Sequence, residues 1–335
     1  MKTEFTRDEI IEILKDDTKN DWLFSLADEV RKQYVGDEIH LRALIEYTNI
    51  CKNACKYCGL RCENRELERY RLTPEEIIDQ AYNAVDMGFK TVVLQGGEDA
   101  FYTDEKMIDI IKAIKAEFPN NAITLSIGER SYESYEKLYK AGADRFLLRH
   151  ESATKSLYES IHNTESFEER RSCLKNLKEI GFQAGAGFMV GLPNQTNENI
   201  VDDLMYVKEL EPAMCGIGPF IPHKDTPFRE FEAGTTEKTV ILLAITRLLL
   251  PKVLLPATTA LASIDANGRN EGLRAGANVI MPNLSPMDVR KKYSLYNNKA
   301  FILDEDAEYR KSIEAKLNEA GFVLEEGRGD KPDWR

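Results

Sequence analysis

The chain has 335 residues, of which 30% are charged, and its formal net charge is −12 at pH 7. This acidic balance argues against nucleic acid or an anionic membrane surface as a main partner. The first residues lack the apolar core of a signal peptide, and the apolar stretch at 240–250 is too short to span a bilayer. Six cysteines without an export signal fit a reducing compartment, so we expect a cytoplasmic protein.

The N-terminal part of the chain is predicted to be helical. Residues from about 6 to 34 read as two helices packed ahead of a first strand at 40–47. A strong helix start follows at Thr73, which can act as N-cap, with Pro74 at the first helical position and Glu76 closing a capping box. This helix is expected to run to Met87.

A repeating unit then follows, consisting of a short β-rich run, a loop and an amphipathic helix. With the first strand, the runs at 91–95, 122–127, 145–149, 182–190, 214–220, 253–260 and 278–281 make eight strands. Helical stretches fall between them at 105–117, 132–141, 167–180, 198–210 and 238–249. This alternation predicts an α/β fold, a (β/α)8 TIM-type barrel, at a length that suits one.

The same pattern predicts how the chain is divided. We expect an N-terminal helical extension at 1–36, the barrel at 37–300, and a C-terminal extension at 301–335 that packs on the barrel. The extension reads as one more helix at 308–320 and a short run at 322–324, followed by a polar end expected to fray.

Three cysteines directly after the first strand form the motif around which the chain is organised. Cys51, Cys55 and Cys58 are spaced C-x3-C-x2-C, and thiolates select zinc, copper(I) or iron–sulfur clusters. Three ligands leave one iron of a cubane open, whereas a structural zinc site takes four ligands, with Cys62 as the candidate fourth. The signature resembles that of radical S-adenosylmethionine (SAM) enzymes, in which the open iron binds the methionine amino and carboxylate groups. One electron then splits the sulfonium to give a 5′-deoxyadenosyl radical.

Polar residues collect where the predicted strands end, which is where a (β/α)8 barrel carries its reactive groups. Each also has a structural interpretation. Gly96-Gly97 can be a tight turn, Arg149 and Glu151 a rim ion pair, and Thr258-Thr259 β-branched strand residues. We expect His150 and His223 to be hydrogen-bonded structural residues, and Cys173 and Cys215 to be small buried hydrophobes.

Longer motifs make the chain similar to the HydE family, the radical SAM maturases of [FeFe]-hydrogenase, over nearly its whole length. They include Tyr57-Cys58-Gly59-Leu60-Arg61, Arg69-Tyr70-Arg71-Leu72-Thr73-Pro74-Glu75-Glu76, Leu94-Gln95-Gly96-Gly97-Glu98-Asp99, Leu147-Leu148-Arg149-His150-Glu151, Gly185-Ala186-Gly187-Phe188-Met189-Val190-Gly191-Leu192-Pro193, Gly216-Ile217-Gly218-Pro219-Phe220-Ile221-Pro222-His223, Pro256-Ala257-Thr258-Thr259-Ala260 and Gly276-Ala277-Asn278-Val279-Ile280-Met281-Pro282-Asn283. These blocks are more diagnostic than the cysteine triplet.

The resemblance implies a role for each group of residues. Cys51, Cys55 and Cys58 would ligate one [4Fe–4S] cluster. Tyr57 would pack by the adenine of SAM, with Gln95 and the turn Gly96-Gly97-Glu98 near the methionine amino end. The rest of SAM would contact Ser126, Arg149, Glu151, Arg170 and Met189. The substrate cavity would be lined by Thr258, Thr259, Ala260, Tyr293 and Tyr296.

It also implies a substrate and partners. The substrate would be a cysteine-bound iron carbonyl–cyanide precursor, at whose sulfur the adenosyl radical acts. The partners would be the maturases HydG and HydF, in transient contact, and a low-potential electron donor. Some family members carry a second, C-terminal cysteine group, but no cysteine follows Cys215, so one cluster is expected.

Three alternatives stay open at this point. Methylornithine synthase, a related mutase, also needs one cluster. Biotin synthase needs additional cysteines on inner strands, where this chain offers Leu94, Ser126 and Met189. A zinc-binding module without catalytic activity could use Cys51, Cys55, Cys58 and Cys62.

Overall fold

The computed structural model describes residues 5–15, 20–300 and 308–334. Its main sheet has six parallel strands that lie side by side in chain order. They are β2 (Ala43–Thr48), β3 (Thr91–Gly96), β4 (Ala122–Ser126), β5 (Arg145–Leu147), β6 (Gln183–Val190) and β7 (Met214–Pro219). Every residue of β2, β6 and β7 is buried, and helices cover the outside of the sheet.

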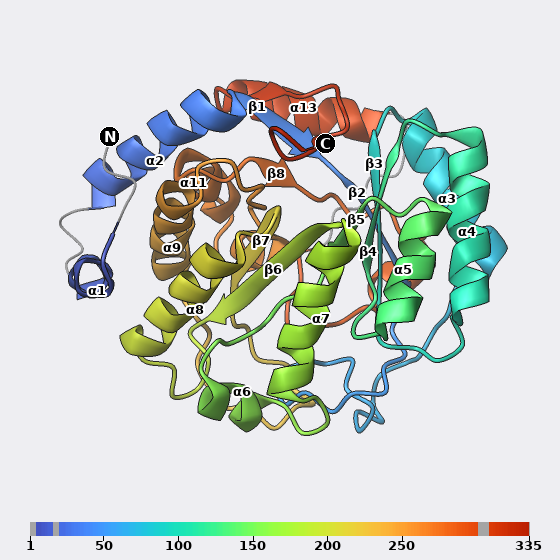
Figure 1. The fold of residues 1–335 in the computed structure, drawn as a ribbon, viewed down its shortest axis with the longest axis horizontal. Coiled ribbons are helices and arrows are strands. Elements are labelled where there is room, and N and C mark those ends of the chain that lie inside the picture. Colours follow the sequence, from blue (N-terminus) through green and yellow to red (C-terminus); the bar gives the residue numbers. More distant parts are fainter. Residues whose placement is uncertain (1–4, 16–19, 301–307, 335) are drawn as a thin grey trace.

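Helices alternate with these strands and pack against the sheet from outside (Figure 1). They are α3 (Pro74–Asp86), α4 (Asp104–Glu117), α5 (Tyr132–Ala141), α6 (Lys155–Ile161), α7 (Phe167–Ile180), α8 (Asn197–Leu210) and α9 (Thr236–Leu249). The capping box predicted at α3 is confirmed: Thr73 Oγ1 accepts from the Glu76 amide, and the Glu76 carboxylate accepts from the Thr73 amide. The expected parallel, alternating β/α architecture is therefore confirmed.

Single parallel bridges complete the arrangement beyond β7. Leu254 pairs with Met214 of β7, Pro256 with Val279 of β8 (Val279–Ile280), and Asn283 with Leu44 of β2. The strand predicted at 253–260 is therefore wrong in extent, since α10 (Thr259–Ile264) already begins at Thr259. Pro256 has no amide hydrogen with which to extend a ladder, and Thr258 is the N-cap of α10.

The predicted first strand also divides in two. β1 (Glu38–Leu41) and β2 are separate strands, and β1 lies between β8 and β9 (Val323–Leu324) in a small sheet of its own. Two short helices that the pattern did not predict, α11 (Gly268–Arg274) and α12 (Met287–Arg290), flank β8 in the sequence.

Both ends of the chain pack on the outside of this body. α1 (Arg7–Lys15) lies against α8 and α2 (Asn20–Val35) against α9, while α13 (Glu308–Glu319) contacts β9. The expectation that the polar end would fray is wrong for 325–334. This tail is fixed across the end of the barrel where the strands begin, because Arg145 at the start of β5 binds Asp330.

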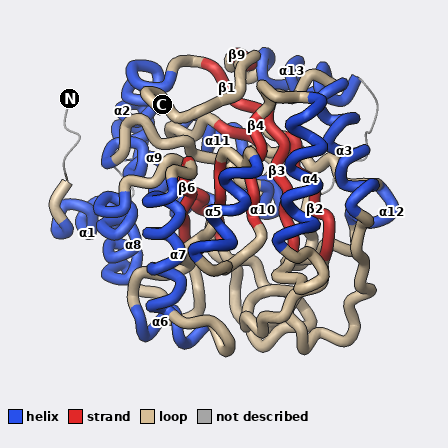
Figure 2. Tube along the Cα trace, turned by 45° about the vertical axis from the view of Figure 1, so that its right-hand side comes forward, coloured by secondary structure: helices blue, strands red, loops and turns tan. Residues whose placement is uncertain are grey.

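Figure 2 shows how the two ends of the barrel differ. Long loops gather at the lower end in this view, where the strands of the main sheet finish, and α13 and β9 lie at the upper end. The cysteine loop that follows β2 belongs to the lower end, so the fold places it where active sites of such barrels lie.

Candidate active site

One cavity of about 340 Å³ opens at the end of the barrel where the strands finish, and it collects every residue that the family resemblance assigned to the cluster, SAM or the substrate. From the cysteine loop and β3 come Cys51, Cys55, Tyr57, Cys58, Gln95, Gly96, Gly97 and Glu98. From the later strand ends and loops come Ser126, Arg149, Glu151, Arg170, Met189, Thr258, Thr259, Ala260, Tyr293 and Tyr296. The sequence thus predicted the location of the cavity; it did not establish what each residue does.

Backbone hydrogen bonds join the cysteine loop to the glycine turn after β3. The Lys52 amide donates to Glu98 O at 3.0 Å, and the Glu98 amide donates to Cys51 Sγ at 3.4 Å. A Cβ on Gly97 would lie 2.2 Å from Ile50 O and 2.8 Å from Cys51 Cβ. Glycine is therefore required here by close approach of the two segments, which fixes the first cysteine against the turn.

Arg69 holds the two ends of the cysteine loop together. Its guanidinium donates to the carbonyls of Asn49 and Leu60 at 2.6 and 2.9 Å, and to those of Arg61 and Asn64 at 2.7 and 3.0 Å. These residues bracket the cysteines on both sides in the sequence. The loop is consequently shaped by a residue outside the cysteine motif.

The three cysteines are free thiols that are neither fully buried nor fully exposed. Burial raises the pKa of Cys58 to about 12 and also raises the pKa values of Cys51 and Cys55. Their sulfurs do not all lie within 4.8 Å of one another. One tetrahedral zinc ion needs sulfurs about 3.8 Å apart, from Zn–S bonds near 2.3 Å, so the spacing fits a larger group better.

Charged side chains form the rim of the cavity. Arg149 Nη2 pairs with Glu151 Oε2 at 2.8 Å, as the rim interpretation predicted, and Arg170 Nε pairs with Glu129 Oε1 at 2.5 Å. Arg170 Nη1 also donates to Arg149 O at 2.7 Å, which ties α7 to the end of β5. The rim therefore presents fixed charges of both signs, as a ligand with a cationic and an anionic group requires.

Polar atoms without protein partners also line the cavity. Thr258 Oγ1 and, at the rim, Arg149 Nε are buried and make no hydrogen bond within the described part of the chain. Buried polar groups are almost always paired, so an unpaired atom that also lines a cavity is a candidate contact for a ligand. Arg42 Nε and Arg145 Nε are unpaired as well but do not line the cavity. The residues present thus fit a bound cosubstrate and substrate.

Four further polar or charged residues that the sequence did not suggest line the same cavity, namely Glu46, Asn53, Glu165 and Lys299. Lys299 forms a buried ion pair with Glu46, and Asn283 Nδ2 donates to Glu46 Oε2 at 2.6 Å. A carboxylate inside the apolar run of β2 was a signal that could have identified Glu46. The other three lie in loops where no pattern distinguishes them.

The structural interpretation of the two strand-end histidines is supported by their contacts. His150 Nδ1 accepts from the Gly187 amide at 3.3 Å, and His223 Nε2 lies 3.1 Å from Ser294 Oγ. Cys173 and Cys215 are both fully buried, as expected of small hydrophobes. None of the four lines the cavity at this end of the barrel.

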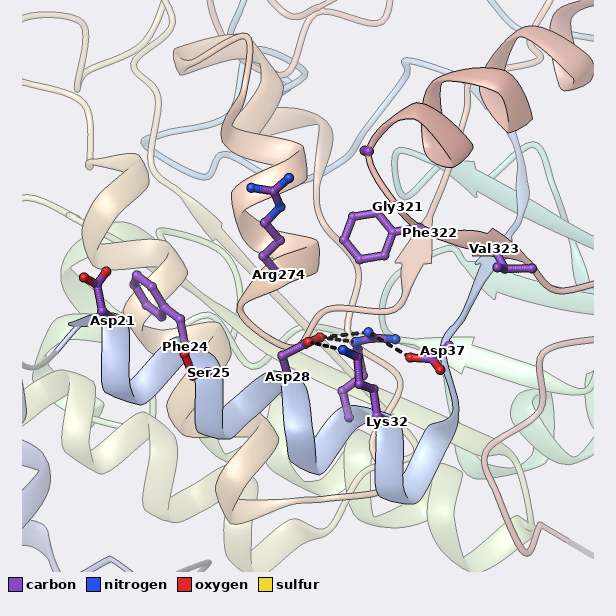
Figure 3. A pocket seen from close by; sticks show the side chains of 12 residues that line it. Asp21, Phe24, Ser25, Asp28, Lys32, Asp37, Arg274, Gly321, Phe322 and Val323 are labelled. Atoms are coloured by element: carbon purple, nitrogen blue, oxygen red, sulfur yellow. Dashed lines mark hydrogen bonds and ion pairs between the residues drawn. The ribbon is translucent and has the colours of Figure 1, made fainter.

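A second depression, of about 750 Å³, lies elsewhere and has a different character (Figure 3). It is bordered by α2, by Arg274 of α11 and by the turn before β9, and some of its charges pair with one another. Arg31 pairs with Asp28 at 2.7 Å and with Asp37 at 3.6 Å. None of the predicted site residues borders it, so it is not the candidate active site.

Two comparisons define the class of protein. The Radical SAM superfamily model matches residues 45–207, which run from β2 into α8 and contain the cysteine loop. A solved structure of methylornithine synthase (PylB) superposes with a TM-score of 0.85 at 26% identity, and the match covers 96% of this chain and 94% of that one. The chain belongs to the Radical SAM superfamily and shares the fold of PylB.

Sequence relatives identify the family within that class. The [FeFe] hydrogenase maturase subunit HydE of Thermotoga maritima is 50% identical over 307 residues, which are 91% of this chain and 88% of the relative. The 3-methylornithine synthase of Methanosarcina acetivorans is 30% identical over 314 residues, 92% of this chain and 85% of the relative. The chain belongs to the HydE family.

The described part of the chain contains no helix that is both long enough and apolar enough to cross a membrane.

Proposed function

We propose that Cys51, Cys55 and Cys58 ligate a single [4Fe–4S] cluster whose fourth iron binds SAM. The family supplies the expectation of a cluster and of SAM. The separation of the three sulfurs and their common position on the cavity support this ligand set over a zinc ion. When bound, the cluster and SAM supply a 5′-deoxyadenosyl radical.

The rim residues would bind and orient SAM. Tyr57 would contact the adenine, with Gln95 and the turn Gly96-Gly97-Glu98 receiving the methionine end. Ser126, Arg149, Glu151, Arg170 and Met189 would contact the remainder. The fixed charges at Arg149–Glu151 and Arg170–Glu129 support this assignment, because SAM carries a sulfonium, an ammonium and a carboxylate.

The deeper part of the cavity would hold the substrate. Thr258, Thr259, Ala260, Tyr293 and Tyr296 line it, and Thr258 Oγ1 is free to donate or accept a hydrogen bond. The buried Lys299–Glu46 pair adds fixed charge at the same place. A small polar or organometallic substrate suits such a lining better than an apolar one.

The activity that these features support best is maturation of the [FeFe]-hydrogenase active-site cluster. The 50% identity to HydE over nine-tenths of the chain carries this proposal. The substrate would be a cysteine-bound iron carbonyl–cyanide precursor, received through transient contact with HydG and passed toward HydF, with a low-potential protein donating the electron. The division into 1–36, 37–300 and 301–335 is proposed with it.

Methylornithine synthase activity is the second candidate, because the fold match is very close and the relative is 30% identical. Biotin synthase activity is less favoured, since Leu94, Ser126 and Met189 stand where inner-strand cysteines would be needed. A zinc-binding module is disfavoured by the sulfur spacing.

A substrate panel tests the proposed activity. Anaerobically reconstituted protein would be reduced with dithionite in the presence of SAM and either the iron complex, lysine or dethiobiotin. Mass spectrometry would follow 5′-deoxyadenosine and its adducts. Turnover with the iron complex alone is expected, whereas turnover with lysine would assign the chain to the mutase activity and overturn the proposal.

A further inference from the structure

Three potential metal ligands meet beside the cysteine loop. Cys55 comes from that loop, and His162 and Glu165 come from the segment that joins α6 to α7. Their ligand atoms all lie within 4.8 Å of one another, with Cys55 Sγ 2.9 Å from Glu165 Oε1 and His162 Nε2 4.0 Å from the same oxygen. Sulfur, imidazole nitrogen and carboxylate oxygen form a ligand set typical of zinc and similar divalent ions.

The imidazole of His162 is oriented as in a metal-binding histidine. Its Nδ1 lies 3.1 Å from Tyr158 O, and a carbonyl can only accept, so Nδ1 carries the proton and Nε2 has a free lone pair. Hydrogen bonding of the remote nitrogen to a carbonyl is the usual support of a metal-ligating histidine. In the present structure the Tyr57 hydroxyl lies 3.2 Å from Nε2, where it can donate to that lone pair.

Glu165 is a nearly buried carboxylate whose basic neighbours are His162 and, at longer range, Arg170. Only 3% of its side chain is exposed, and in the described part of the chain it makes no ion pair with a lysine or an arginine. Its Oε2 accepts from Thr164 Oγ1 at 2.8 Å and its Oε1 accepts from the Cys55 thiol. A buried carboxylate of this kind is costly unless it is paired or binds a cation.

The segment that carries these ligands is held firmly against the cysteine loop. The Lys56 amide donates to Ile161 O at 2.9 Å, and the Ala54 amide donates to Thr164 Oγ1 at 3.2 Å. Lys56 Nζ also donates to Ser160 O at 2.8 Å. The relative placement of the three ligands is therefore built by contacts other than their own.

We propose that Cys55, His162 and Glu165 hold one divalent transition-metal ion in the cluster-free protein. Bonds of about 2.0–2.3 Å in a tetrahedral site separate the ligand atoms by roughly 3.3–3.8 Å, which the observed 2.9 and 4.0 Å bracket. The charges of a thiolate and a carboxylate balance that of the ion. Cys55 and Glu165 both line the cavity, so an ion bound by them can exchange with the cavity.

This inference has a consequence that rests on the proposed function. Cys55 cannot serve the ion and a [4Fe–4S] cluster together, so the ion must leave before the cluster is completed. Zinc at this site would then slow cluster reconstitution.

Metal binding to the cluster-free, full-length chain tests the proposal. Anaerobic titration with Co²⁺ should give thiolate-to-cobalt charge-transfer bands and the strong visible absorption of a tetrahedral ion. Competition with Zn²⁺ then gives the zinc affinity. We expect His162→Gln and Glu165→Gln each to weaken the zinc affinity by more than about tenfold. Loss of a residue that only supports a metal ligand already costs about tenfold, and loss of a ligand should cost more.

The controls separate this site from the cysteine triad. Glu159→Gln removes an exposed carboxylate from neighbouring α6 and should leave the zinc affinity unchanged, as should Cys51→Ala. Circular dichroism would establish that each variant is folded. An affinity that is lost in Cys51→Ala but unchanged in both His162→Gln and Glu165→Gln would overturn the proposal, as would absence of binding to the native chain.

The binding titration contains no iron, sulfide or SAM, so its outcome does not depend on the proposed function. A chain that binds zinc as expected but cannot be reconstituted with a cluster would contradict the proposed function alone. A chain that reconstitutes normally but shows no zinc site would contradict this inference alone.

Discussion

At the end of the barrel where the strands begin, buried charges are paired by the chain itself. Arg145 is fully buried there and donates to Asp330 at 2.5 Å, to Arg328 O at 2.7 Å and to Thr91 Oγ1 at 3.0 Å. Arg145 Nε and, at the other end, Arg149 Nε are both buried without a partner in the described chain, so the two ends differ at Thr258, whose Oγ1 is buried with no partner beside a cavity of about 340 Å³.

The difference shows which end is built for stability and which for binding. The C-terminal tail supplies the partners at the first end, so the polar groups there contribute to folding. At the second end the chain leaves the Thr258 hydroxyl beside the cavity for a ligand to satisfy. Variants at the two ends should therefore separate into those that change stability and those that change binding or catalysis.

The largest expected effect is on catalysis, at the cavity end. Cys55→Ala should abolish reductive cleavage of SAM, because the cluster loses a ligand, while Cys62→Ala should leave cleavage largely intact because Cys62 is exposed outside the triad. The measurement is 5′-deoxyadenosine formed after anaerobic reconstitution and reduction. Loss of cleavage in Cys62→Ala would mean that the ligand set is wrong.

The next largest effect is on stability, at the opposite end. Arg145→Met should lower the free energy of unfolding by about 3 kcal/mol, because it breaks a buried ion pair. This value lies in the lower part of the range for such changes, since Asp330 is one-third exposed and still pairs with Arg328 in the variant. Urea denaturation measures this loss. The matched control is Arg7→Met, which breaks an exposed pair with Asp202 and should cost less than about 1 kcal/mol. Equal losses of unfolding free energy in both variants would contradict the claim that the C-terminal tail stabilises the fold through Arg145.

Two threonines provide a smaller and closely matched comparison. Thr91→Val should cost about 1–2 kcal/mol, because Thr91 Oγ1 donates to Arg328 O at 2.8 Å and accepts from Arg145. Thr258→Val should leave stability unchanged within about 0.5 kcal/mol, since the hydroxyl has no partner to lose. Unfolding curves of both variants, with substrate turnover of Thr258→Val, would check this. A destabilised Thr258→Val with normal turnover would contradict the binding role.

The smallest effect is a pH dependence of stability from Asp330. Burial alone would raise the pKa of this carboxyl, but Arg145, Gln183 and Arg328 together lower it to about 2. A depressed pKa adds stability above the unfolded value near 3.9, and the contribution is lost as the pH falls toward about 2. Discounted for partial exposure, it is on the order of 1 kcal/mol. Asp330→Asn should thus be less stable than the native protein at pH 7, with the difference closing in acid.

Local patterns predicted much of this fold. The capping box at Thr73 and the alternation of strands and helices depend on neighbouring residues, and both are confirmed. Because strand ends meet at one edge, the strand-end residues of the cavity could be gathered from the sequence, whereas Arg170, Tyr293 and Tyr296 were expected only from the family resemblance.

What could not be predicted depends on contacts between distant parts of the chain. Nothing near Arg328 or Asp330 in the sequence shows that they reach Arg145, and the tail was expected to fray. Thr258 and Thr259 are β-branched and suggest a strand, yet packing places them at the start of α10. Glu165 and Lys299 lie in loops whose positions only the fold determines.

The most direct test of the central claim is the iron and acid-labile sulfide content of the reconstituted chain. We predict about four of each per chain for the native protein and for Cys62→Ala, and almost none for Cys51→Ala or Cys58→Ala. Tightly bound zinc without sulfide, or a cluster that depends on Cys62, would contradict the proposal that three cysteines at this end of the barrel hold one [4Fe–4S] cluster.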